Sequence, residues 1–244
     1  MPDYAVVIPA FNEEAYLPDT LRCLREVMSS IDRDGEIIVV DNHSTDATAE
    51  VARAHGADRV VFEPHNQIAR ARNAGAESTE ARFLIFVDAD TRVSKELCEK
   101  ALRMLESCEV AGGGAKVVMD GPVSPMVGWI VKQWERASKW FQYAAGSFFF
   151  CRRDAFEEVG GFEEGVYAGE EIWFARRLKR WARRKGMHFQ VIQSPPVVTS
   201  NRKSSWFSSM DFVLQLAMIF FLPWTMRSRR FCQIWYARPA DGSK

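Results

Sequence analysis

The fold of this chain is decided by the stretch Phe83-Leu84-Ile85-Phe86-Val87-Asp88-Ala89-Asp90. Its five apolar residues predict a strand that is buried on both faces, as in a parallel sheet covered by helices. Two carboxylates then follow at the point where this strand meets solvent. Such oxygen ligands suit Mg²⁺ or Mn²⁺, with water and phosphate oxygens completing the coordination. Taken alone, the D-x-D motif favours a plainer interpretation, which is a turn and a helix N-cap after the strand.

Strands and helices alternate in the first half of the chain. The apolar pattern predicts strands at residues 4–8, 36–40, 59–62 and 83–87. Helices are expected to follow these strands, and Ser94 is expected to cap one of them. Ser44 or Asp46 is expected to cap another, which ends at His55. This alternation predicts an α/β fold with a mostly parallel central sheet flanked by helices.

The second half of the chain is less regular. It contains expected strands at residues 110–119 and 147–151 and expected helices at 127–143 and 170–185. No linker rich in Gly, Pro or Ser divides the chain. We therefore predict a single domain over residues 1–203, followed by a C-terminal apolar and basic helical extension over residues 204–244.

The C-terminal part is basic and carries an apolar run. Residues 170–244 hold 14 Lys and Arg against 4 Asp and Glu, although the chain as a whole has no net charge. This asymmetry indicates an anionic partner, while a solvated helix face explains part of it. Residues 212–222 are nearly all apolar but too few to span a bilayer. They are either a core helix or a helix in the membrane interface, with aromatic residues at headgroup level and basic residues on anionic lipid. Those aromatic residues are Trp206, Phe207 and Trp224.

Cysteine usage and the start of the chain bear on the compartment. The five cysteines are scattered and form no C-x-x-C pair, so we expect reduced thiols. A strand is expected almost at the first residue, which leaves no room for a signal peptide. We therefore expect a cytoplasmic protein, with peripheral contact at the inner face of the cell membrane. The four histidines show no metal-ligand spacing, and we expect no nucleic-acid partner.

A polar loop follows each of the four expected strands of the first half. The carboxyl ends of parallel strands lie at one edge of a sheet, so these loops are expected to converge. Their sequences are P-A-F-N-E at 9–13, D-N-H-S-T-D at 41–46, N-Q-I-A-R-A-R-N-A-G at 66–75 and D-A-D at 88–90. The set is far more specific than any single motif within it.

These loops, together with G-E-E at 169–171, resemble the motifs of family-2 inverting glycosyltransferases of the GT-A fold, over residues 4–200. The resemblance implies metal-dependent transfer of a sugar from a nucleotide-diphosphate sugar, with Mg²⁺ or Mn²⁺ as cofactor. It implies that Asp90 and Asp88 bind the metal. The nucleotide-sugar-binding residues that it implies are Pro9, Phe11, Glu13, Asp41, Asn66, Arg70 and Asp88.

Elementary chemistry agrees with these roles. A divalent cation stabilises the charge that develops on a diphosphate leaving group. The carboxylate of Asp41 only accepts hydrogen bonds, so it would suit the imide N–H of uracil or the edge of guanine. A UDP-sugar is the favoured donor, and a GDP-sugar is the alternative.

Glu170 and Glu171 open the helix expected at 170–185, where the helix dipole favours ionised carboxylates. An ionised carboxylate can take the proton of an acceptor hydroxyl. Matched position by position, the resemblance makes Glu171 the catalytic base and Glu170 its support. The family usually has Glu-Asp here, so which of the two glutamates acts stays open. Compensation of the helix dipole alone is the plainer interpretation.

The sequence departs from the residue pattern of this fold at one further place. Some members supply a histidine late in the chain as a metal ligand, and residues 195–202 contain none. Arg202 and Lys203 are candidates to hold phosphate instead, with a solvated loop as the alternative. The acceptor is a hydroxyl or a phosphate. The basic C-terminal part favours a lipid or lipid phosphate, while a soluble acceptor stays open.

Two other functions are open to a sheet of this kind. A nucleotidyltransferase would need a Gly-rich, basic phosphate loop near the N-terminus, and residues 9–13 have no glycine, lysine or arginine. The other is a non-catalytic module that binds a nucleotide-sugar or a membrane. The intact D-A-D motif and the Glu170-Glu171 pair argue against loss of catalysis.

Overall fold

The structure, a computed structural model, describes residues 1–121, 146–202 and 222–237, together with positions 128, 133, 206, 210 and 214. Most residues of the helix expected at 127–143, of the apolar run at 212–222 and of the extension after residue 203 lie outside the described part. Within the described part of the chain, no helix has both the length and the hydropathy that crossing a bilayer requires.

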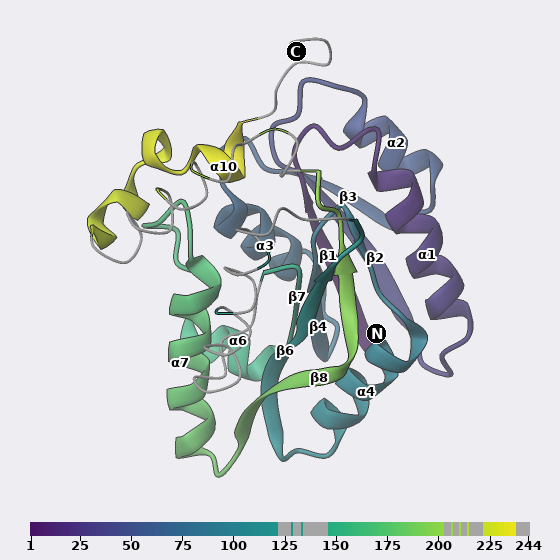
Figure 1. Ribbon diagram of the computed structural model, residues 1–244. Coiled ribbons are helices and arrows are strands. Elements are labelled where there is room, and N and C mark those ends of the chain that lie inside the picture. Colours follow the sequence, from purple (N-terminus) through teal and green to yellow (C-terminus); the bar gives the residue numbers. More distant parts are fainter. Residues whose placement is uncertain are drawn as a thin grey trace.

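Eight strands of the described chain form one sheet in the order β3-β2-β1-β4-β7-β6-β8-β5 (Figure 1). Its first four members are parallel neighbours, as the alternation of strands and helices predicts. They are β1 (Tyr4–Ala10), β2 (Gly35–Asp41), β3 (Arg59–Phe62) and β4 (Phe83–Val87). Their carboxyl ends therefore share one edge of the sheet.

The second half of the sheet is mixed in direction. Strand β7 (Phe148–Arg152) is antiparallel to β4 and to β6 (Val110–Met119). Strand β8 (His188–Thr199) runs parallel to β6, and its end pairs with the short β5 (Thr91–Arg92). The sequence analysis did not predict β8. Pro195 and Pro196 interrupt its pattern, and the β6–β8 ladder skips the segment that holds them.

Helices cover both faces of the sheet (Figure 1). One apolar cluster lies between the sheet and the helices α1, α2 and α4. A second cluster lies on the opposite face, between the sheet and the helices α3, α6 and α7. Strand β1 shows why, because Val6 enters the first cluster and Val7 the second, as the two-residue period of a strand requires. The helices are α1 (Leu17–Ser29), α2 (Thr48–Ala54), α3 (Ile68–Glu77), α4 (Lys95–Glu106), α6 (Arg153–Val159) and α7 (Glu170–Arg184).

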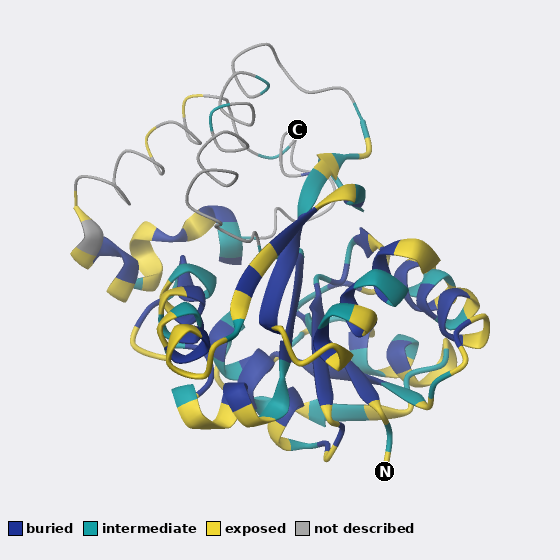
Figure 2. Cartoon of the chain, turned by 90° about the horizontal axis from the view of Figure 1, so that it is seen from below, coloured by how far each residue is buried: buried dark blue, intermediate teal, exposed yellow. Residues whose placement is uncertain are grey.

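The central strands β1, β4 and β7 are almost entirely buried, while the edge strand β3 and the outer faces of the helices are exposed (Figure 2). Strand β4 is buried at every position, which confirms the prediction made from its apolar run. A sheet covered on both faces presents its loops, rather than its faces, to a ligand.

The helix termini correct one prediction. Ser94 caps α4 as expected, because its Oγ accepts a hydrogen bond from the backbone N–H of Leu97 at 3.2 Å. Helix α2 begins only at Thr48, so neither Ser44 nor Asp46 is its N-cap. Instead, Ser44 Oγ accepts from the N–H of Asn12 at 3.1 Å, and Asp46 Oδ2 accepts from that of Glu14 at 3.2 Å. Both side chains tie the loop after β2 to the loop after β1.

Part of the C-terminal region lies against the carboxyl edge of the sheet. It comprises η1 (Pro223–Arg227), η2 (Arg229–Phe231) and α10 (Gln233–Tyr236). Tyr236 Oη accepts a hydrogen bond from the N–H of Ile68 at 3.3 Å, and Arg229 donates to Asn66 Oδ1 at 2.8 Å. These contacts place α10 beside the start of α3 (Figure 1).

Candidate active site

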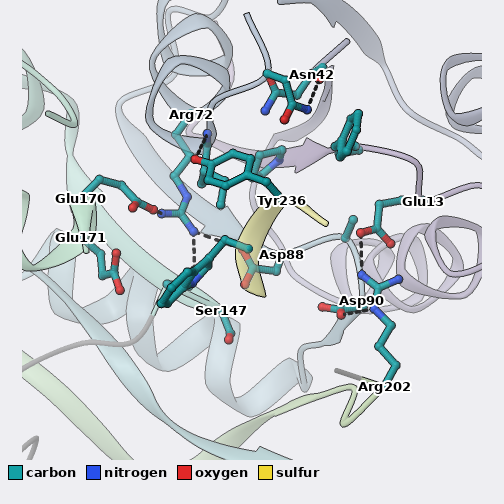
Figure 3. A pocket seen from close by; sticks show the side chains of 18 residues that line it. Glu13, Asn42, Arg72, Asp88, Asp90, Ser147, Glu170, Glu171, Arg202 and Tyr236 are labelled. Carbon is teal, nitrogen blue, oxygen red and sulfur yellow. Dashed lines mark hydrogen bonds and ion pairs between the residues drawn. The ribbon is translucent and has the colours of Figure 1, made fainter. Parts of the chain in front are cut away.

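A pocket of about 260 Å³ lies at the carboxyl ends of β1, β2 and β4 (Figure 3). It brings together loops that are distant in the sequence, as the parallel topology predicts. Eight of the predicted site residues line it, namely Pro9, Phe11, Glu13, Asn66, Asp88, Asp90, Glu170 and Glu171.

Two predicted residues, Asp41 and Arg70, do not line the pocket. Asp41 is buried behind it and accepts a hydrogen bond from the N–H of Ser44 at 3.0 Å, while the next residue, Asn42, faces the cavity. Arg70 pairs with Glu164 at 3.1 Å on the surface. The pocket contains Arg72 instead, because two residues along a helix turn a side chain by about 200°.

Arg72 connects the two acidic sides of the pocket. Its guanidinium is buried and lies 2.6 Å from Glu170 Oε1 and 3.1 Å from Asp88 Oδ1. It also donates to the carbonyl oxygen of Gly146 at 3.0 Å and lies over the ring of Phe162. Figure 3 shows its guanidinium between the carboxylates of Glu170 and Asp88. The sequence contained the residue, but nothing in its local pattern distinguished it from Arg70.

Arg202 has the same role on the other side of the pocket. Its Nη2 lies 2.5 Å from Glu13 Oε1 and its Nε 2.9 Å from Asp90 Oδ2, and all three side chains are buried (Figure 3). Sequence reasoning singled out Arg202 for phosphate but not for these carboxylates. Lys203, its predicted companion, lies outside the described residues.

The first two loops hold each other in place. The side-chain amide of Asn12 contacts Thr45, accepting from its N–H at 2.8 Å, and Glu13 N–H donates to Thr48 Oγ1 at 2.8 Å. Asn12 has a φ of 51° and His43 a φ of 65°, a left-handed region that non-glycine residues occupy only where the surroundings enforce it. Hydrogen bonds thus join residues 9–13 to residues 41–48 along the pocket wall.

Glu171 differs in ionisation from the sequence-based expectation. Its burial and the negative charge of Glu170 raise the pKa of Glu171 to about 8, and the charge of Arg72 opposes this only in part. The helix dipole, worth about 1 kcal/mol or less, is too weak to offset such desolvation. The Glu171 carboxyl therefore holds its proton more tightly than an exposed glutamate does.

Asp88 and Asp90 fit a hard divalent cation by the chemistry of their oxygens, since both carboxylates enter the same cavity. Asp88 is the more accessible, with 34% of its side chain exposed. No group of three or more His, Cys, Asp and Glu residues with metal-binding geometry occurs in the described ranges. A cation here would take its other ligands from water and from diphosphate, as Mg²⁺ does.

The comparisons with known proteins bear on the family and the fold of the chain. The open α/β sheet has a pocket with the D-x-D motif at its carboxyl edge. Residues 5–160 match the family model of glycosyl transferase family 2, and the chain belongs to that family.

Two curated relatives illustrate the range of the family. The chain is 26% identical over 189 residues to the glycosyltransferase AglE of Haloferax volcanii, covering 72% of this chain and 61% of AglE. It is 33% identical over 132 residues to an uncharacterized glycosyltransferase of Mycobacterium tuberculosis, covering 53% of this chain and 57% of that protein. The chain thus spans less than two-thirds of these relatives.

Solved structures share the fold at low identity. A mannosyltransferase from Pyrobaculum calidifontis in complex with GDP-Man and Mn²⁺ has a TM-score of 0.64 and 19% identity, covering 91% of this chain and 64% of that one. TarS of S. aureus, residues 1–349 in complex with UDP-GlcNAc, has a TM-score of 0.60 and 15% identity, covering 89% and 66%. These likenesses confirm the predicted GT-A type α/β fold.

The buried Arg72–Glu170 pair yields a stability prediction. Arg72→Met leaves the Glu170 carboxylate buried without its partner, which is expected to cost about 3–5 kcal/mol. The double variant R72M/E170M removes both charges and is expected to recover most of that loss. Urea unfolding measures the difference, with R70Q as the control because an exposed ion pair contributes about 0–1 kcal/mol. A loss in R72M no larger than in R70Q would contradict the assignment.

The raised pKa of Glu171 yields a pH prediction. The folded state binds this proton more tightly than the unfolded state, so the group stabilises the fold below about pH 4.5 and loses that contribution as pH rises towards 8. The Tm of E171Q minus that of the natural protein should therefore grow between pH 5 and 8.5, by about 2–4 °C for each ~1 kcal/mol. The exposed E164Q serves as the control. A difference that stays flat across this window argues against the raised pKa.

Proposed function

We propose that the enzyme transfers a sugar from a nucleotide-diphosphate sugar to an acceptor in one displacement that inverts the anomeric centre. One observation carries the proposal: a single pocket holds Asp88 and Asp90 on one side, Glu170 and Glu171 on the other, and Arg72 between them. Through a divalent cation, the first pair would serve the leaving diphosphate, and the second pair would serve the incoming nucleophile. An inverting displacement needs only one base on the acceptor side and no nucleophile from the enzyme, which fits this arrangement.

The nucleoside is assigned to the wall formed by the loops after β1, β2 and β3. Phe11, Asn42 and Asn66 line this part of the cavity, and Asp41 holds the second loop in place from behind. UDP-sugars are the favoured donors and GDP-sugars the alternative. TarS was solved with UDP-GlcNAc and the Pyrobaculum enzyme with GDP-Man, so the fold accommodates both bases.

The charge of the pocket supports use of a divalent cation. Its described lining contains five carboxyl groups against two guanidinium groups, so the cavity alone would repel a diphosphate. Mg²⁺ or Mn²⁺ held by Asp90 and Asp88 would reverse this repulsion, and when bound it neutralises the charge on the departing diphosphate. The carboxyl groups are those of Glu13, Asp88, Asp90, Glu170 and Glu171, and the guanidinium groups are those of Arg72 and Arg202.

Glu171 is the better candidate for the base. The carboxylate of Glu170 is buried and bound to Arg72 at 2.6 Å, so it is unavailable to an acceptor. Glu171 lines the same cavity with a pKa raised by burial and by Glu170 to about 8, close to the pH at which a base works best. Glu170 and Arg72 then act as positioning residues.

The assay follows from these roles. Purified protein with Mn²⁺ is expected to release nucleoside diphosphate from a UDP-sugar or GDP-sugar. The variant E171Q should lower kcat by about 10²–10⁴ with donor binding retained, and D90N should remove the activity. Asp120→Asn, outside the pocket, is the control. A nucleotidyltransferase would instead release pyrophosphate from a nucleoside triphosphate, and turnover of D90N in EDTA would rule out the metal role.

We further propose a lipid or lipid-phosphate acceptor at an anionic membrane surface. Beside the pocket wall, the segment 222–231 exposes Trp224 by 65% and Phe231 by 47%, close in sequence to the exposed Arg227 and Arg230. Aromatic side chains next to arginine are typical of segments that lie in the membrane interface.

Co-sedimentation with vesicles of phosphatidylserine and phosphatidylcholine tests this surface. The protein should bind at low salt and dissociate as salt screens the attraction. The variant W224S/F231S should bind less, while W173S, which removes an exposed tryptophan on α7, should bind normally. Protein that stays in the supernatant at low salt would refute the membrane contact without affecting the transferase assignment.

A further inference from the structure

The contacts of Arg202 bear on how a metal ion enters the site. The guanidinium bridges Glu13 and Asp90 at 2.5 and 2.9 Å, and it stacks on the ring of Tyr16 with its Cζ 4.3 Å from the centroid. Only 8% of Arg202 is exposed, yet the residue lines the donor pocket (Figure 3). The positively charged guanidinium of Arg202 therefore already lies beside the second carboxylate of the D-A-D motif, where a metal ion would bind.

Both oxygens of the Asp90 carboxylate are engaged in this arrangement. Oδ2 faces Arg202, and Oδ1 accepts from Thr199 Oγ1 at 3.3 Å. The backbone carbonyl of Asp90 also accepts from the N–H of Ser200 at 3.1 Å. A divalent ion that takes Asp90 as a ligand must therefore displace the guanidinium from a close ion pair with little exposure to solvent, where the attraction between opposite charges is stronger than in water.

We propose that Arg202 is a latch that couples binding of the divalent cation to binding of the donor diphosphate. In the free enzyme, Arg202 holds Asp90 and disfavours the metal. When a diphosphate enters, the guanidinium turns to its oxygens, keeps Glu13 as a partner and releases Asp90 to the metal. This inference rests on the proposed function, since it concerns the same donor pocket.

The chemistry of arginine suits this exchange. A guanidinium has five N–H donors in one plane and binds carboxylate and phosphate oxygens with the same geometry. Moving from Asp90 to a diphosphate replaces one anionic partner by another, so the buried positive charge is never left unpaired. Because binding linkage is reciprocal, the metal must then strengthen diphosphate binding as much as diphosphate strengthens metal binding.

The test measures binding of Mn²⁺ by calorimetry, alone and with saturating UDP, in the natural protein and in R202Q. We expect R202Q to bind Mn²⁺ alone about tenfold more tightly, because Asp90 is freed, and to bind UDP alone more weakly. The factor by which UDP strengthens Mn²⁺ binding should be smaller in R202Q than in the natural protein. If Arg202 were merely structural, or only held phosphate, replacing it would not strengthen Mn²⁺ binding.

The matched control is R92Q, which removes a positive charge two residues from Asp90 but from an arginine that pairs with Asp120. Equal Mn²⁺ affinity in R202Q and the natural protein, or the same gain in R92Q, would overturn the latch. Thermal unfolding verifies that R202Q is folded. If R202Q does not fold, the double variant E13Q/R202Q replaces it, because it leaves no unpaired buried charge at Glu13, and it is expected to show the same gain in Mn²⁺ affinity. Turnover of a nucleotide-sugar is measured separately. The binding data can therefore refute the latch without refuting the proposed transferase activity, and the turnover data can refute that activity without refuting the latch.

Discussion

The site depends on two buried arginines that hold together carboxylates which would otherwise repel one another. Arg72 joins Asp88 to Glu170, and Arg202 joins Glu13 to Asp90. Each arginine links the sheet edge to an element from elsewhere in the chain. A buried carboxylate left without a cation is costly, so these pairs offset the charge that converging loops bring together.

Even so, the charges do not balance, and this imbalance explains the chemistry. Three negative charges remain in excess if all five carboxyl groups of the described lining are ionised. One response is visible in Glu171, whose pKa is raised so that it holds its proton. The proposed divalent cation would supply another. A site poised in this way favours binding of cation and diphosphate together over binding of either alone.

Much of the fold could be predicted from local sequence. The buried run at 83–87 and the alternation of strands and helices led to the parallel half of the sheet, and the topology rule then placed four loops at one edge. Strand β8 was missed because two prolines interrupt it. The start of α2 was misplaced because Ser44 and Asp46 bond to the loop after β1, although Asp46 also accepts from the N–H of Thr48, the first residue of the helix.

The sequence by itself determined the class of fold and the motifs that carry the chemistry, because strand periodicity and polar loops are local properties. Only the tertiary structure decided which cation meets which carboxylate. Arg72 and Glu170 are 98 residues apart, and Arg202 and Glu13 are 189 apart. The choice of Arg72 over Arg70 rests on the rotation of α3 against the sheet, and that of Arg202 on the return of β8 beside β5. Such pairings depend on which distant segments the fold brings together, and no local sequence pattern contains that information.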